Sequence, residues 1–144
     1  MWGRGGDAQS YITNNAAQWT GRDLIIIQIG DNVNTADRQQ RFATFFPQLV
    51  ADIRSKSPNA RVIIVGIWFY NQTVMNTLQS TAVKYGCQLV DISTLNTSSN
   101  QATAGTTVTY ADGTTYAIQA TWAFHPGDTG HQAIADAVIN AIDM

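Results

Sequence analysis

The sequence predicts a single α/β domain, in which a parallel sheet lies between two layers of helices. Three apolar segments with the composition of buried strands recur along the chain, at residues 23–30, 61–68 and 88–92. The segments between them have helical periodicity and are long enough for right-handed crossovers between parallel strands. The chain has 144 residues, 44% of them hydrophobic, which is enough for one core but not for two. We therefore expect a three-layer α/β/α sandwich with a flavodoxin-like sheet over residues 1–144.

The segment at 23–30 is the clearest strand, and it reads Asp-Leu-Ile-Ile-Ile-Gln-Ile-Gly. Polar and apolar residues do not alternate in it, which is typical of a parallel strand buried on both faces. A short helix over residues 8–19 is expected before it, with Gly21 at the helix end. The segments 61–68 and 88–92 repeat the pattern and predict the second and third strands.

Helices are expected between these strands. A long helix begins after a cap at Thr35 or Asp37, and its apolar residues recur at helical spacing. Pro47 lies inside this helix and predicts a kink or a restart. A second helix is expected over residues 71–85 and ends at Gly86.

A different composition sets apart residues 94–124, which are rich in Thr, Ser, Ala and Gly. Within this region, residues 107–110 and 114–118 flank Ala-Asp-Gly, and this pattern predicts a small β-hairpin. The last helix is expected over residues 128–142. The hairpin is therefore interpreted as an insertion before the last helix.

Charge and composition exclude several classes of function. Charged residues make up only 12% of the chain, the net charge is −2, and no basic patch is present. A nucleic acid or an anionic membrane surface is therefore not an expected partner. The longest apolar runs, 24–29 and 62–69, are too short to span a membrane. The single cysteine, Cys87, has no partner for an internal disulfide and is expected to be a small buried residue.

No cofactor or metal is expected. The glycines around Gly6 match neither a phosphate loop nor a dinucleotide-binding motif. His125, Asp128 and His131 follow one another at intervals of three residues. The Pro-Gly pair after His125 disrupts the helix that would place these side chains together as metal ligands.

Polar and aromatic residues follow the first two predicted strands. Ligands of open parallel sheets bind beyond the carboxyl ends of the strands. That rule selects Asp31, Asn32 and Asn34 after the first strand, and Trp68 and Tyr70 at the end of the second. The two aromatic residues fit core packing as well as the edge of a site.

The loop before the last helix is expected at the same edge and contains Trp122 and His125. An amide N–H such as that of Asn32 is a suitable donor to an oxyanion, and a histidine is the usual general base for a hydroxyl nucleophile. We expect the side chains of Asn32 and His125 to lie within about 10 Å of each other, close enough to share one small substrate. Ser93 is the only serine just beyond the end of a predicted strand.

At these residues the sequence resembles the SGNH (GDSL-like) hydrolases, over nearly the whole chain. The family has a nucleophilic serine in Gly-Asp-Ser, an oxyanion glycine, an oxyanion asparagine in Gly-x-Asn and a histidine before the last helix. Gly30-Asp31-Asn32 looks like the asparagine motif, and Gly5-Gly6-Asp7 looks like the glycine motif. The segment His125-Pro126-Gly127-Asp128-Thr129-Gly130-His131 looks like the family's His-Pro-x-x-x-Gly-His.

The resemblance implies an ester hydrolase that uses no cofactor. His125 would be the base, and the Gly6 N–H and the Asn32 side chain would form the oxyanion hole. The substrates would be small esters, including acylated carbohydrates.

Two parts of the family pattern are absent. The chain has no Gly-Asp-Ser, and Trp122 stands where the family has an aspartate. We therefore expect a βα unit of roughly 30 residues to be missing upstream of Trp2, and this form to be weak or inactive, with Ser93 as a low-ranking substitute nucleophile. The loss would open the edge of the strand Leu24–Ile29, which predicts a homo-oligomer or a swapped segment there.

Two other interpretations stay open at this point. One is a catalytically inactive binding or interaction module on the same fold. The other is a flavodoxin-like binder of a small ligand, unrelated to esterases.

Overall fold

The computed structural model describes residues 8–143, which form two compact units that divide after Asp91. The elements of the first unit follow in chain order: α1 (Ala8–Asn15), the 3-10 turn η1 (Ala16–Gln18), β1 (Leu24–Gln28), α2 (Ala36–Lys56), β2 (Arg61–Val65), α3 (Gln72–Tyr85) and β3 (Gln88–Val90). The second unit contains the 3-10 turn η2 (Ser93–Leu95), β4 (Thr107–Thr109), β5 (Thr115–Ala117) and α4 (Asp128–Asp143). The helices and strands expected from the sequence are thus all present, with shifted ends.

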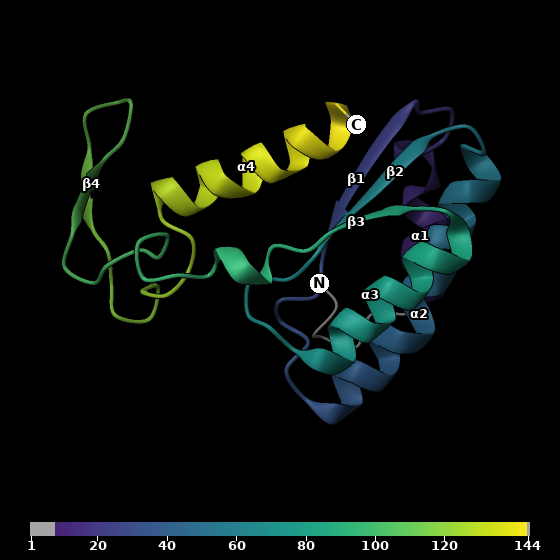
Figure 1. The fold of residues 1–144 in the computed structure, drawn as a ribbon, viewed down its shortest axis with the longest axis horizontal. Coiled ribbons are helices and arrows are strands. Elements are labelled where there is room, and N and C mark those ends of the chain that lie inside the picture. The colour runs from purple at the N-terminus through teal and green to yellow at the C-terminus, as the bar shows by residue number, and fades with distance from the viewer. Residues whose placement is uncertain (1–7, 144) are drawn as a thin grey trace. The chain divides into compact units, whose positions relative to one another are not determined.

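The first unit is a parallel α/β structure, as predicted. Its sheet has the order β1-β2-β3, and each strand is parallel to its neighbour. The helices α1, α2 and α3 lie on one side of this sheet (Figure 1). This is the result expected of two right-handed crossovers that proceed in the same direction. Because α4 belongs to the second unit, the third layer of the sandwich stays a prediction.

The core of the first unit lies between the sheet and these helices. The apolar stripe of α2 is buried as expected, and it packs with Val62 and Ile64 of β2. Its members are Phe42, Phe45, Phe46, Leu49, Val50 and Ile53. Pro47 lies within one continuous helix, so the expected restart is wrong. Proline removes only one helical hydrogen bond, and the stripe is buried on both sides of it.

Side-chain and glycine caps fix the helix ends of this unit. The Thr35 side chain accepts a hydrogen bond from the Arg38 N–H at 3.4 Å, so Thr35 is the cap of α2. The Asn71 side chain caps α3 in the same way, at 3.1 Å. Gly86 ends α3 with a left-handed conformation, φ 60°. Cys87, expected to be buried, is half-buried after this glycine.

β1 differs from the prediction of a strand buried on both faces. Ile27 is 8% exposed, but Leu24 and Ile26 are 39% and 47% exposed. The physical reason is position: in the described sheet β1 pairs only with β2 and is an edge strand. β2, which has a strand on each side, agrees with the prediction of burial on both faces.

The second unit contains the predicted hairpin. β4 and β5 are antiparallel, with Val108 opposite Tyr116. In the turn between them, the Asp112 carboxylate accepts hydrogen bonds from the N–H and the hydroxyl of Thr114. These bonds stabilise the charged form and lower the pKa of Asp112.

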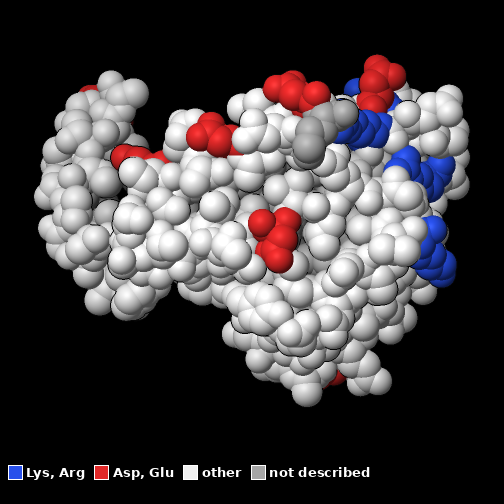
Figure 2. All heavy atoms as spheres, in the orientation of Figure 1, with Lys and Arg blue, Asp and Glu red and all other residues white. Residues whose placement is uncertain are grey.

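Charge is unevenly distributed between the two units. Residues 92–144 contain no Lys or Arg. On the face drawn in Figure 2, the blue side chains accordingly all lie on the first unit. None of the helices in residues 8–143 combines the length and the apolar character that a membrane span requires.

Candidate functional site

A tight turn follows β1 and brings it close to the segment that follows β2. The Val33 N–H donates to the Gly30 carbonyl at 2.9 Å, and Gly30 has a φ of 131°. A Cβ at position 30 would lie 3.0 Å from side-chain atoms of both Ile67 and Val74. Glycine is therefore required here for its conformation and for its small size.

Asp31 joins the two loops at the carboxyl edge of the sheet. Its Oδ1 accepts hydrogen bonds from the backbone N–H groups of Trp68, at 2.7 Å, and Phe69, at 3.1 Å. Charge-assisted bonds of this kind are short and strong. Asp31, predicted at the edge of the site, therefore braces the loop that holds Asn32.

Arg38, one turn into α2, holds the rest of this loop. Its Nη1 donates to the Asn32 carbonyl at 3.1 Å and to the Asn34 Oδ1 at 3.0 Å. The Asn34 side chain is thus occupied within the loop. The Asn32 side chain is exposed, and its amide makes no hydrogen bond to any of residues 8–143. The loop therefore fixes the backbone of Asn32 and leaves its amide open to a ligand.

The two aromatic residues after β2 have different environments. Trp68 is 2% exposed, so its ring belongs to the packing and not to an open edge. Tyr70 is 58% exposed, and its hydroxyl donates to Gln72 at 2.6 Å. Of this pair, only Tyr70 presents its ring to solvent at the carboxyl edge.

His125 is exposed, and the backbone around it is fixed by the segment 100–102. The Ala102 N–H donates to the His125 carbonyl at 2.8 Å, and the Phe124 N–H donates to the Ala102 carbonyl at 3.3 Å. The Gly127 N–H donates to the Asn100 carbonyl at 2.9 Å. These hydrogen bonds attach the loop before α4 to residues 100–102. They therefore fix the position of the His125 backbone within the second unit.

The start of α4 explains the second glycine of the His-Pro-x-x-x-Gly-His segment. A Cβ at Gly130 would lie 2.2 Å from the Asn100 carbonyl oxygen, so the helix approaches the backbone too closely for any side chain. The Thr129 hydroxyl donates to the Ser99 carbonyl at 2.7 Å. His131 is exposed in the first turn of the helix, and its N–H donates to the Gly127 carbonyl.

Trp122 replaces the aspartate of the family pattern and has an aromatic partner. It is 49% exposed, and its ring stacks on Tyr116 of β5 with 5.3 Å between the centroids. It provides no carboxylate to orient the imidazole of His125.

The structure does not show whether the expected catalytic residues lie close to one another. Asn32 and His125 belong to different units, so their convergence stays a prediction. Ser93 begins η2 and is half-buried, and its role as a substitute nucleophile is likewise untested. Gly6 lies outside the described residues.

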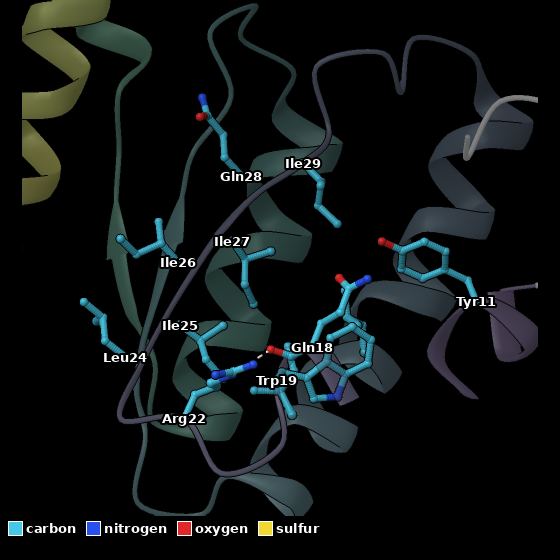
Figure 3. A pocket seen from close by; sticks show the side chains of 12 residues that line it. Tyr11, Gln18, Trp19, Arg22, Leu24, Ile25, Ile26, Ile27, Gln28 and Ile29 are labelled. Carbon is cyan, nitrogen blue, oxygen red and sulfur yellow. Dashed lines mark hydrogen bonds between the residues drawn. The ribbon is translucent and has the colours of Figure 1, made fainter. Parts of the chain in front are cut away.

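A groove that the sequence did not predict runs along β1 and has a volume of about 450 Å³. In Figure 3, Ile25, Ile27 and Ile29 point toward α1 and η1, whereas Leu24 and Ile26 point away. The groove is lined by Tyr11, Gln18, Trp19, Arg22, Leu49, Ile53 and residues 24–29. Its only signal in the sequence is the apolar run of β1, and that run does not show that β1 is an edge strand among the described residues.

Comparison with known proteins gives no family for this chain. No family model matches it, and no curated protein matches it. The fold and the two braced loops are therefore the basis for any statement on function.

Proposed function

We propose that this domain is an ester hydrolase of the SGNH type, with Asn32 as an oxyanion donor and His125 as the general base. The observation that supports it most is the loop after β1. Gly30, Asp31 and Arg38 fix its backbone while the Asn32 amide stays exposed at the carboxyl edge of the sheet. His125 has a similar arrangement, an exposed imidazole on a hydrogen-bonded loop.

The proposal includes a complete fold for the domain, a three-layer sandwich in which α4 covers the face of the sheet opposite α2. Two apolar surfaces support it. The side of the sheet away from α2 includes Ile63, which shares a face with Ile26 and is 0% exposed. α4 has its own half-buried apolar residues, Ile134 and Val138.

In this mechanism His125 takes the proton of a hydroxyl nucleophile as its oxygen attacks the ester carbonyl. The Asn32 N–H then donates to the negative carbonyl oxygen, which forms as the C=O double bond becomes single. When that double bond reforms, the alcohol leaves with the proton from the imidazolium of His125 and the acyl group stays on the nucleophile. A water that gives its proton to His125 then attacks the acyl carbonyl, and the acid is released as the nucleophile takes that proton back.

The nucleophile limits the activity expected of this chain. Its 144 residues contain no Gly-Asp-Ser, and the aspartate that orients the histidine is replaced by Trp122. Removing a triad serine typically costs about 10⁶ in turnover and leaves only the contributions of the oxyanion hole and of binding. We therefore expect slow hydrolysis, little above the rate in buffer.

Hydrolysis of a chromogenic acetyl ester by the whole chain tests this proposal. Asn32→Ala and His125→Ala are expected to reduce the residual rate to that of buffer. The matched controls Asn140→Ala and His131→Ala change an exposed amide and an exposed imidazole in α4, and they are expected to leave the rate unchanged. Equal rates in all four variants would contradict the proposal. Fast hydrolysis that is lost in Ser93→Ala would instead identify Ser93 as the nucleophile.

A catalytically inactive binding module on the same fold is the second candidate, and the absence of Gly-Asp-Ser favours it. It predicts that neither Asn32→Ala nor His125→Ala affects ester hydrolysis. A flavodoxin-like small-ligand binder predicts the same result, but it gives His125 no part in binding.

A further inference from the structure

The segment of the second unit that precedes His125 contains three aromatic residues, and we call them the aromatic platform: Tyr116, Trp122 and Phe124. The rings of Tyr116 and Trp122 stack with an interplanar angle of 25°. Trp122 is 49% exposed and Phe124 is 62% exposed. Large apolar rings are normally buried, so a stacked ring pair with an exposed member, followed two residues later by a second exposed ring, indicates a surface that binds a ligand.

The backbone of one platform residue, Phe124, is in a strained conformation. Phe124 has a φ of 73°, and it is the only non-glycine residue with positive φ among residues 8–143. A bulky residue in this conformation is strained, and such strain is concentrated at functional sites. The pair of hydrogen bonds between Ala102 and the Phe124–His125 segment maintains it.

The charge of the second unit indicates the kind of ligand. Residues 92–144 contain four Asp and no Lys or Arg. Aromatic platforms that stack nucleic-acid bases occur together with cationic side chains that neutralise the phosphates, and this unit has none. The same lack of cationic side chains disfavours other anionic ligands. The unit also has ten Thr, which supply hydroxyl donors and acceptors and favour a neutral, hydroxyl-rich ligand.

We propose that the aromatic platform binds a pyranose ring of a neutral polysaccharide. One face of a pyranose consists largely of C–H groups, which pack on an aromatic ring, while its hydroxyls bond to polar side chains around the edge. Tyr116 supports Trp122 from one side, and Phe124 is placed two residues further on. As the substrate class of the esterase this inference rests on the proposed function, because a sugar bound here would present its acyl groups beside His125.

Affinity electrophoresis of the whole chain tests sugar binding without any hydrolysis. The native gels contain hydroxyethylcellulose or galactomannan, which are neutral, or polygalacturonate, which is anionic. The neutral polymers are expected to retard the chain, and polygalacturonate is not. Trp122→Ala is expected to weaken the retardation about tenfold, the effect of losing one stacking contact.

Two further variants separate ring loss from misfolding. Phe124→Gly removes the ring but suits the positive φ, so it is expected to unfold no more easily than the parent and to bind more weakly. The matched control is Tyr110→Ala, because Tyr110 is a 59% exposed aromatic residue at the end of β4, outside the platform. It is expected to bind like the parent.

Several outcomes would overturn the inference. These are no retardation by either neutral polymer, equal binding by the parent and Trp122→Ala, or a loss in Tyr110→Ala as large as in Trp122→Ala. Self-association that disappears in Trp122→Ala, without retardation, would assign the platform to a protein contact. Retardation without any Asn32- and His125-dependent ester hydrolysis would retain the platform and reject the esterase, and the reverse result would do the opposite.

Discussion

β1 and β2 have nearly the same composition but very different surroundings. Ile26 and Ile63 are partners in the register of the sheet and so lie on the same face, yet Ile26 is 47% exposed and Ile63 is 0% exposed. Within residues 8–143, Ile63 has a strand neighbour on each side, whereas Ile26 has one. The apolar composition of a parallel strand therefore does not determine how exposed its side chains are. Their exposure depends on which strands lie beside it.

On the side of β1 that no other described strand pairs with, backbone groups are also left without a strand partner. The Asp23 carbonyl accepts a hydrogen bond from the Arg61 N–H at 2.7 Å, so residue 23 faces β2. Because backbone groups alternate in direction along a strand, those of Leu24, Ile26 and Gln28 face away from β2. No Lys or Pro protects this edge, which is unusual for an exposed edge strand.

The largest loss in the free energy of unfolding is expected for a substitution in β2, whose apolar side chains are fully buried. Ile64→Ala in β2 removes a side chain that is 0% exposed and packs against α2. We expect a loss of about 2–5 kcal/mol in the free energy of unfolding, because a cavity remains in the core. The matched control is Ile26→Ala in β1, which we expect to cost under about 1 kcal/mol. Urea unfolding measures both, and equal losses would mean that β1 is as buried as β2.

The contrast between β1 and β2 shows which structural features the sequence predicts and which it does not. Local signals predicted a cap at Thr35 or Asp37, the glycine end at Gly86 and the hairpin around Asp112, because each depends on a few adjacent residues. The exposure of Ile26 could not be predicted, since it depends on which strand lies beyond β1.

The candidate site was predictable to a similar degree. Asn32 and Tyr70, which follow β1 and β2, are exposed as an open site edge requires, while Trp68 is buried, in agreement with its interpretation as a core residue. The stacking of Trp122 on Tyr116 joins a turn to a strand of the hairpin, and no pattern within either segment shows such a pairing.

A smaller effect is expected at the point where β1 meets the segment after β2. Gly30→Ala introduces a Cβ 3.0 Å from Ile67 and Val74, at a φ of 131°. We expect it to cost about 1–3 kcal/mol in the free energy of unfolding. Gly21→Ala is the matched control, because Gly21 also has positive φ but nothing within 4 Å of its Cβ position. If the two variants lose the same amount, the crowding at Gly30 contributes nothing, and only its φ does.

The open edge of β1 is expected to drive self-association. Pairing of this edge with a second copy would satisfy its backbone groups and cover Ile26. Light scattering over a concentration series should therefore show an average mass above that of the monomer. Ile26→Lys places a charge on the edge and should weaken association about tenfold, whereas Val83→Lys, on the outer side of α3, should not. A parent chain that stays monomeric at high concentration would contradict the expectation.

The smallest effect concerns the wall of the groove beside β1, which is held by Asp52 of α2. Its carboxylate accepts a hydrogen bond from the Trp19 indole N–H at 2.8 Å and pairs with Lys56. Burial raises the pKa of Asp52, but the hydrogen bonds from Lys56 and Trp19 and the charge of Lys56 outweigh burial, so the pKa lies below its usual value. A carboxyl whose pKa is lower in the folded state adds stability above the pKa of the unfolded chain. That stability is lost as the pH falls through the pKa of the folded state.

Asp52→Asn removes this pH-dependent contribution while it keeps an oxygen acceptor for Trp19. At pH 7 we expect the variant to be less stable by about 0.5 kcal/mol, the usual size for a pair at a surface. Near pH 2.5 the difference should shrink, because the parent carboxyl is then being protonated. The matched control is Asp37→Asn, which breaks the exposed ion pair with Arg41 in the first turn of the same helix and leaves the groove wall intact. Urea unfolding of the three chains at both pH values measures the effect. A difference between the parent and Asp52→Asn that is as large at pH 2.5 as at pH 7 would show that the charge of Asp52 does not hold η1 on α2.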